Sequence, residues 1–308
     1  MLYRAAVVCL AAVSMAGSAL ASPFFSLDAA SPSVPGVSNN DVLAPGPVGG
    51  PPAVATPSGA LGLSPGLPNE LDAMTTGAPV DPLAIFFSVD RAAVGLPGGP
   101  APDVFSEASA GQAAGDVFVS GGGGSNALVF NQDILGLLPA VAPGVSASAP
   151  IDNLDALDLA GAAAPGVGFY SLLAGNSFGL SGADILLTPA GGGPPIVAVS
   201  ALALGLTFAD DIDALHLDTS TGDCLFSLAP GSPSLTTLLA FAGDVLVAPG
   251  CGGGGAPSVL FAGLTLGLAP GDNLDGLAFI SEIPEPGSFA LVALGLTALA
   301  RVGRRGRP

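Results

Sequence analysis

The chain has 308 residues and half of them are hydrophobic, so it is long enough for one or two domains with a real core. Glycine (46) and proline (30) are abundant and tryptophan is absent, which favours short strands joined by turns and argues against long helices. The net charge is −18, there is no lysine, and Arg91 is the one arginine outside the two terminal segments. Such a chain repels phosphate backbones, so we expect no nucleic acid partner. The acidity fits the solubility of an exported protein or, as the alternative, attraction of Ca²⁺.

The first 21 residues have the pattern of a secretory signal peptide. Arg4 gives a positive start, an apolar stretch follows over 5–16, and Ala19-Leu20-Ala21 forms a small-x-small cleavage site. We therefore predict a signal helix over 1–21 and a mature chain that begins near Ser22.

The body is predicted to be one domain over 22–282 that consists of four repeats, at about 24–78, 86–162, 169–220 and 225–281. Each repeat opens on an aromatic residue followed by serine: Phe25-Ser26, Phe87-Ser88, Tyr170-Ser171 and Phe226-Ser227. An aspartate then leads an apolar alternation: Asp41, Asp116, Asp184 and Asp244. Each repeat closes on a motif like "DNLDAL", which contains a second acid: Asp72, Asp155, Asp213 and Asp275.

Each repeat offers about four strand candidates, such as "FYSLL", "DILLT", "IVAVSA" and "LDALDL", separated by Gly, Pro, Asn or Asp. Four strands repeated radially are typical of propeller blades. The first repeat lacks a preceding motif strand and the last lacks a following aromatic-Ser strand, so strands from both ends would complete one blade and remove open edges. We predict an all-β, four-bladed β-propeller. A linear β-solenoid or two packed sheets are the alternatives.

The closing motif would form the innermost strand of each blade. This assignment places Asp72, Asp155, Asp213 and Asp275 at one level near one mouth of the channel, followed by the small residues Ala73, Ala156, Ala214 and Gly276. In the favoured interpretation these acids accept backbone N–H groups and fix a recurring turn. In the second they are Ca²⁺ ligands. Fourfold repetition argues against the asymmetric acid–base pair of a glycosidase.

Other candidate chemistry is sparse. His216, the single histidine, is interpreted as a structural or solvated strand residue, and no catalytic residue is assigned. After signal removal two cysteines remain, Cys224 and Cys251, for which we expect a disulfide in an oxidising compartment rather than metal ligation.

Residues 283–308 combine Pro284-Glu285-Pro286, an apolar run over 289–300 predicted to be a short helix, and an arginine cluster that contains Arg301, Arg304 and Arg305. This order resembles the PEP-CTERM sorting signal of Gram-negative bacteria; an ordinary C-terminal anchor helix is the alternative. The resemblance implies transient membrane retention, processing near Pro-Glu-Pro by an exosortase-type enzyme, and delivery to the cell surface or exopolysaccharide matrix. The body also resembles a repeat of exported bacterial proteins of unknown function.

We therefore expect an exported, non-catalytic protein of the cell surface, outer envelope or extracellular matrix, with surface polysaccharide as a candidate partner. The first alternative is a Ca²⁺-dependent binding module that uses Asp72, Asp155, Asp213 and Asp275. The second is a secreted hydrolase or lyase, which the scarcity of His, Lys, Tyr and Trp disfavours.

Overall fold

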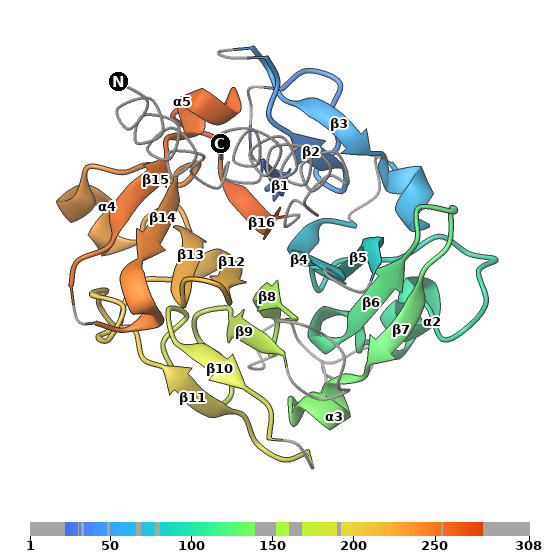
Figure 1. The fold of residues 1–308 in the computed structure, drawn as a ribbon. Helices are drawn as coiled ribbons and strands as arrows, with labels where there is room; N and C mark the ends of the chain where they lie inside the picture. The colour runs from blue at the N-terminus through green and yellow to red at the C-terminus, as the bar shows by residue number, and fades with distance from the viewer. Residues whose placement is uncertain are drawn as a thin grey trace, which may run out of the picture. The chain divides into compact units, whose positions relative to one another are not determined.

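The described part of the chain forms four antiparallel sheets of four strands each, arranged radially as the blades of a four-bladed β-propeller (Figure 1). The structure is a computed structural model. It describes residues 22–29, 31, 34–47, 50–65, 69–77, 81–138, 152–159, 168–189, 192–253 and 255–279. These belong to one compact unit, Ser22–Phe279. The propeller prediction is thus confirmed, and the alternatives of a solenoid or two packed sheets are not.

The strands of each blade are named here from the axis outward. Blade 1 contains β16 (Leu274–Phe279), β1 (Pro23–Leu27), β2 (Val42–Ala44) and β3 (Ala53–Thr56). Blade 2 contains β4 (Leu71–Gly77), β5 (Asp81–Val89), β6 (Val117–Ser120) and β7 (Ala127–Phe130). Blade 3 contains β8 (Leu154–Asp158), β9 (Phe169–Leu172), β10 (Ile185–Leu187) and β11 (Ile196–Val199). Blade 4 contains β12 (Ile212–Asp218), β13 (Asp223–Leu228), β14 (Val245–Ala248) and β15 (Ser258–Phe261).

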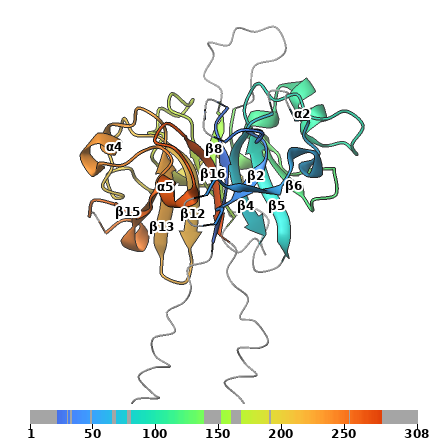
Figure 2. The ribbon, with the colours of Figure 1, turned by 90° about the horizontal axis from the view of Figure 1, so that it is seen from above.

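The predicted closing motif does form the innermost strand of every blade. β4, β8, β12 and β16 pack against one another around the axis, and the side view shows β8 and β16 at the middle of the body (Figure 2). A sequence repeat is therefore offset from a blade by one strand, because its last strand begins the next blade.

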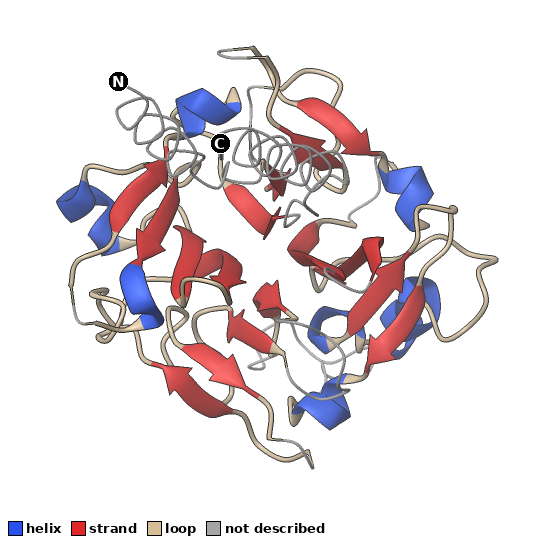
Figure 3. Cartoon of the chain, viewed as in Figure 1, coloured by secondary structure: helices blue, strands red, loops and turns tan. Residues whose placement is uncertain are grey.

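Short helical segments connect the strands (Figure 3). The α-helices are α2 (Val104–Ala110), α3 (Gln132–Leu135), α4 (Pro233–Leu238) and α5 (Gly263–Leu266). The 3-10 segments are η1 (Ser58–Leu61), η2 (Ala113–Gly115) and η3 (Pro249–Cys251). None of the helices in the described ranges is long and apolar enough to cross a membrane. The predicted signal helix over 1–21 and the C-terminal helix in 283–308 lie outside the described residues.

Blade 1 closes the ring with strands from both ends of the body. β1 pairs antiparallel with β16, from Pro23 opposite Phe279 to Leu27 opposite Leu274. The prediction that one blade would contain strands from both termini is confirmed. The pairing removes the open edges that these two strands would otherwise present.

The recurring aromatic-Ser pair is explained by packing between blades. All four aromatic side chains (Phe25, Phe87, Tyr170 and Phe226) and the serines that follow them are fully buried. Three of the serines donate to a carbonyl of the next blade's inner strand: Ser26 to Leu71 (3.3 Å), Ser171 to Ile212 (2.8 Å) and Ser227 to Leu274 (3.0 Å). Ser88 donates instead to Ala114 O at 3.3 Å. The apolar clusters likewise combine residues of neighbouring blades, so the core lies between the blades.

A Leu-Gly-Leu turn follows the fourth strand of each blade. Its glycines all have positive φ: Gly62 (+74°), Gly136 (+73°), Gly205 (+78°) and Gly267 (+85°). The leucines on both sides of each glycine are buried. A Cβ atom on Gly267 would lie 2.1 Å from Gly50 O of blade 1. The corresponding distance to the outer loop of the next blade is 2.0 Å for Gly136, 2.5 Å for Gly205 and 2.8 Å for Gly62. The turn therefore requires glycine both for its conformation and for contact between blades.

Candidate functional site

The four motif aspartates lie at equivalent β-bulges on the inner strands. In β4, Leu71 pairs with Val89 and Ala73 with Ser88, while Asp72 between them has no partner on β5. The same register shift passes over the other three acids of the set: Asp155, Asp213 and Asp275. A bulge leaves one residue outside the ladder and re-aims its side chain. We call these four acids the carboxylate ring.

The members of the carboxylate ring are buried and repel one another. Their exposed fractions are 8, 7, 5 and 8% for Asp72, Asp155, Asp213 and Asp275. Burial raises the pKa of all four carboxyls, that of Asp213 to about 8, and neighbouring acids raise them further. Asp155 feels all three other members, Asp213 and Asp72 most strongly. The four acids therefore occupy equivalent positions on the inner strands and influence one another electrostatically.

Each ring acid lies beside the second residue of the next blade's motif. We call each of these four places, where a ring acid meets that residue of the next blade, a joint. The amide of Asn153 donates a short hydrogen bond to Asp72 Oδ2, and Asn273 Nδ2 donates to Asp213 Oδ2 at 2.7 Å. At the third joint Asp211 takes the place of the asparagine and lies within hydrogen-bonding distance of Asp155. At the fourth joint Glu70 raises the pKa of Asp275 by charge repulsion, after burial and the acids Asp72 and Asp213. The four joints thus alternate between an amide and a second acid.

Several oxygens around the ring lack a donor. In the described part of the chain, four buried oxygens have no hydrogen-bond partner: Asn153 Oδ1, Asp155 Oδ2, Asp211 Oδ1 and Asn273 Oδ1. All four are acceptors, so the ring is short of hydrogen-bond donors. A buried polar atom left without a partner costs about 1–3 kcal/mol.

The other acids of the repeats fix turns, which is the role that the favoured interpretation gave to the four ring acids. Asp210 accepts N–H groups from Thr207 (2.6 Å) and Ser234 (2.8 Å), and both hydroxyls as well. The acids before the third strands each accept a backbone N–H from beyond the fourth strand: Asp41 from Ser58, Asp116 from Gln132, Asp184 from Ala201 and Asp244 from Gly263. The carboxylate ring differs, because its donors within the described residues are asparagine side chains.

A ready-made metal shell was not found at the ring. Within the described ranges, no three His, Cys, Asp or Glu side chains come close enough to hold one metal ion. The structure therefore does not assign Asp72, Asp155, Asp213 and Asp275 as metal ligands. A polar hollow of about 250 Å³ lies near the ring, lined by residues that include Asp28, Ser31 and Asn39. Asp28 contributes to the raised pKa of Asp275, behind burial and the acids Asp72, Asp213 and Glu70.

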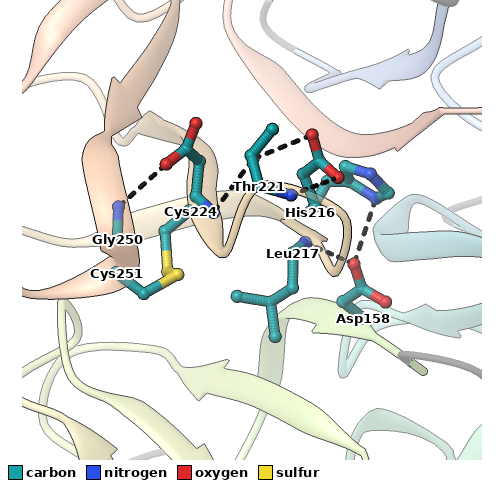
Figure 4. Close-up of a disulfide and its surroundings, with 9 residues drawn as sticks. Asp158, His216, Leu217, Thr221, Cys224, Gly250 and Cys251 are labelled. Atoms are coloured by element: carbon teal, nitrogen blue, oxygen red, sulfur yellow. Dashed lines mark hydrogen bonds and ion pairs between the residues drawn. A yellow bond between two sulfur atoms is a disulfide. The ribbon is translucent and has the colours of Figure 1, made fainter.

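His216 and the cysteines lie together at the far end of β12 (Figure 4). His216 Nδ1 is 3.0 Å from Asp158 Oδ2 of blade 3, a distance typical of an ion pair, although the geometry is not that of a hydrogen bond. The imidazole ring also contacts the Phe279 ring at 4.9 Å between centroids. Cys224 and Cys251, for which the sequence predicts a disulfide, are linked in the structure (S–S 1.98 Å).

Sequence reasoning missed the partners of these residues. Asp158 and His216 occupy equivalent positions in two repeats. The second position of the closing motif is likewise occupied by Glu70, Asn153, Asp211 and Asn273 in the four repeats. Variation at that second motif position is the signal that could have found the joints. The sorting residues Pro284, Glu285, Pro286, Arg301, Arg304 and Arg305 lie outside the described residues.

No model of a known protein family matches the chain, and a search of curated proteins found no significant match.

Proposed function

We propose that this chain is an exported, non-catalytic protein of the cell surface or extracellular matrix, sorted by its C-terminal segment. The observation that carries the proposal is the disulfide between Cys224 and Cys251. Such bonds persist outside the cytoplasm. The bond supports the same location as the signal-peptide pattern over 1–21 and the PEP-CTERM-like pattern over 283–308.

The carboxylate ring supports a binding or structural role for the body. Its four acids are equivalent by the repeat, whereas acid–base catalysis needs two groups with different roles. Within the described residues, His216 contacts an acid and a phenylalanine ring and has no hydroxyl or thiol among its hydrogen-bond partners. These features favour a matrix or surface component over a hydrolase or lyase.

Export and sorting can be tested with the full chain in a Gram-negative host that has an exosortase-type enzyme. The change is the triple replacement Pro284→Ala, Glu285→Ala and Pro286→Ala, with Gly287→Ala as the matched control. We expect the unaltered chain and the control to lose the tail and reach the surface, and the triple variant to keep its tail in the inner membrane. Fractionation and the mass of the mature product give the answer. Unchanged processing of the triple variant would remove the sorting proposal.

The Ca²⁺-dependent module has less support, since no three acids in the described ranges share a metal site. Calorimetry with CaCl₂ tests it directly. Heat of binding together with a rise in melting temperature would favour this alternative, and the absence of both would remove it.

A further inference from the structure

The joint between blades 3 and 4 has a carboxylate where two other joints have the amide of an asparagine. At the joints of Asp72 with Asn153 and of Asp213 with Asn273, the asparagine NH₂ group donates to the ring carboxylate. At the joint of blades 3 and 4, Asp211 stands where the asparagine would be, opposite Asp155. An ionised carboxylate can only accept.

Neither acid of this joint finds the missing donor elsewhere. Asp211 Oδ2 accepts Ala174 N–H at 3.2 Å, but Asp211 Oδ1 has no partner among the described residues. Asp155 Oδ2 also has none, and both side chains are at least nine-tenths buried. At the fourth joint the second acid does find donors, because Glu70 accepts from Ala29 N–H and from Asn39. Among the acids of the four joints in the described residues, Asp155 and Asp211 are therefore the two that have a buried carboxylate oxygen without a donor.

We propose that Asp155 and Asp211 bind one proton between them, so that the joint of blades 3 and 4 is a proton-binding site. The proton comes from solvent, forms an O–H bond on one carboxyl group and is donated in a hydrogen bond to the other. The pair then carries a single negative charge. Its O–H group replaces the asparagine N–H donor of the two amide joints.

The groups that face this pair favour uptake of the proton. Asp155 on β8 faces Asp72 on β4, Asp213 on β12 and Asp275 on β16, all acidic. Within the described residues, no lysine or arginine forms an ion pair with these acids. Burial raises the pKa of Asp155, and the acids Asp213, Asp72, Asp211 and Asp275 raise it further. Burial likewise raises the pKa of Asp211.

Two reciprocal substitutions test the inference, with melting temperature followed from about pH 5 to about pH 9. Asp211→Asn supplies a permanent N–H donor, so it should raise the melting temperature above that of the unaltered chain at high pH, by about 2–4 °C. It should also flatten the decline with pH. Asn273→Asp creates a second acid pair, so it should steepen that decline. The adjacent turn-fixing acid gives the control: Asp210→Asn should lower the melting temperature at every pH.

An unchanged slope in both Asp211→Asn and Asn273→Asp would overturn the proposal. A melting temperature that CaCl₂ raises at high pH in the unaltered chain, but not in Asp211→Asn, would also overturn it, because a metal would then occupy the two oxygens. If Asp211→Asn fails to fold, two measurements remain. Asn273→Asp still reports on the slope, and the infrared band of protonated carboxyl groups at neutral pH should be stronger in the unaltered chain than in Asp155→Asn. Absence of this difference would overturn the proposal.

Discussion

Two acids three positions apart in one motif have opposite environments in this fold. Asp152 accepts from Leu138 N–H, Ser177 N–H and the Ser177 hydroxyl, so its charge is well solvated by the protein. Asp155, three residues later on β8, is buried among other carboxyls and has an oxygen without a donor among the described residues. The difference is the supply of donors, since both side chains are buried.

Asp213 makes the propeller less stable as the pH rises. Burial lifts its pKa from the usual value near 4 to about 8, so the folded state binds the proton more tightly than the unfolded state does. The contribution is fully present below about pH 4 and is lost as the pH rises through about 8. We expect the free energy of unfolding to fall over this range, and Asp213→Asn to recover on the order of 2 kcal/mol at pH 9. Urea unfolding at several pH values measures it.

The control for this prediction is Asp218→Asn. Burial is the largest single influence on Asp218 and raises its pKa, but the hydrogen bonds from Ser220 and Thr221 together outweigh burial and lower the pKa overall. Its contribution is therefore lost only as the pH falls into the acid range. In Asp218→Asn the slope of the free energy of unfolding against pH should not change above pH 5. Equal effects of the Asp213 and Asp218 replacements at pH 9 would contradict the expectation.

The position of the carboxylate ring could be predicted from the sequence, but its partners could not. Four copies of one motif imply four equivalent places, so Asp72, Asp155, Asp213 and Asp275 had to lie at one level of any closed ring. The hydrogen bond from Asn273 to Asp213 joins different blades. The sequence shows that the second motif position varies, but it does not show that this position faces the bulge of the preceding blade.

The blades are joined by two kinds of repeated contact, the aromatic-Ser pair and the Leu-Gly-Leu turn. Ser171 and Ser227 bond to the next inner strand near the axis, and Gly136 and Gly267 approach the next blade's outer loop. The three joints that have the serine contact are therefore fixed at two radii, which limits how far those blades can tilt against each other.

Gly267→Ala should be strongly destabilising, because a Cβ atom would meet Gly50 O of blade 1 at 2.1 Å in addition to the strain of a φ of +85°. We expect a loss of about 3–5 kcal/mol in the free energy of unfolding. Gly222→Ala is the matched control, since Gly222 has a φ of +80° but open space around its Cβ position. It should lose only about 1–2 kcal/mol. Similar losses would show that the close contact between blades 4 and 1 does not contribute to the free energy of unfolding.

The Cys224–Cys251 link, with a sequence separation of 27, joins β13, the second strand of blade 4, to the 3-10 segment η3 that follows β14. Closing a loop of this size restricts the unfolded chain, so the pair Cys224→Ala and Cys251→Ala should lower the free energy of unfolding by about 3 kcal/mol. Denaturant midpoints measure the change. Reduction of the unaltered chain should give a similar loss. If neither treatment moves the midpoint, the bond contributes nothing to stability.

Strand type was predictable, whereas strand register and the helical turns were not. Alternating segments such as "GDVLVAP" identify β14 and its equivalents by period and turn residues. The bulges at Asp72 and its equivalents are set by pairing with the second strand and by close packing at the axis. Gly276 shows how close this packing is, since a Cβ there would lie 2.4 Å from Met74 Cγ.

The circle of four blades closes in the same way at each blade, so we expect the chain ends to be tolerated in another blade as well. Blade 1 joins β16 from one end to β1 from the other, and blade 4 has an exposed turn between its two inner strands at Ser220 and Thr221. A body with new ends between Ser220 and Thr221, and a short linker from Phe279 to Pro23, should fold to a propeller of similar melting temperature. A body that lacks residues 274–279 should lose cooperative unfolding. A permuted chain that does not fold would show that the position of the ends matters.

The pairing of β1 with β16 also sets an order of events. β1 is among the first parts of the body to be synthesised, and its partner is the last. Blades 2, 3 and 4 each have an inner strand close in sequence to their second strand, so they can assemble as they emerge. Blade 1 cannot form until some 250 residues have followed β1. Since β1 and β16 are so far apart in the sequence, we expect their pairing to be the slow step of folding. The body is therefore an open arc until its final strand arrives.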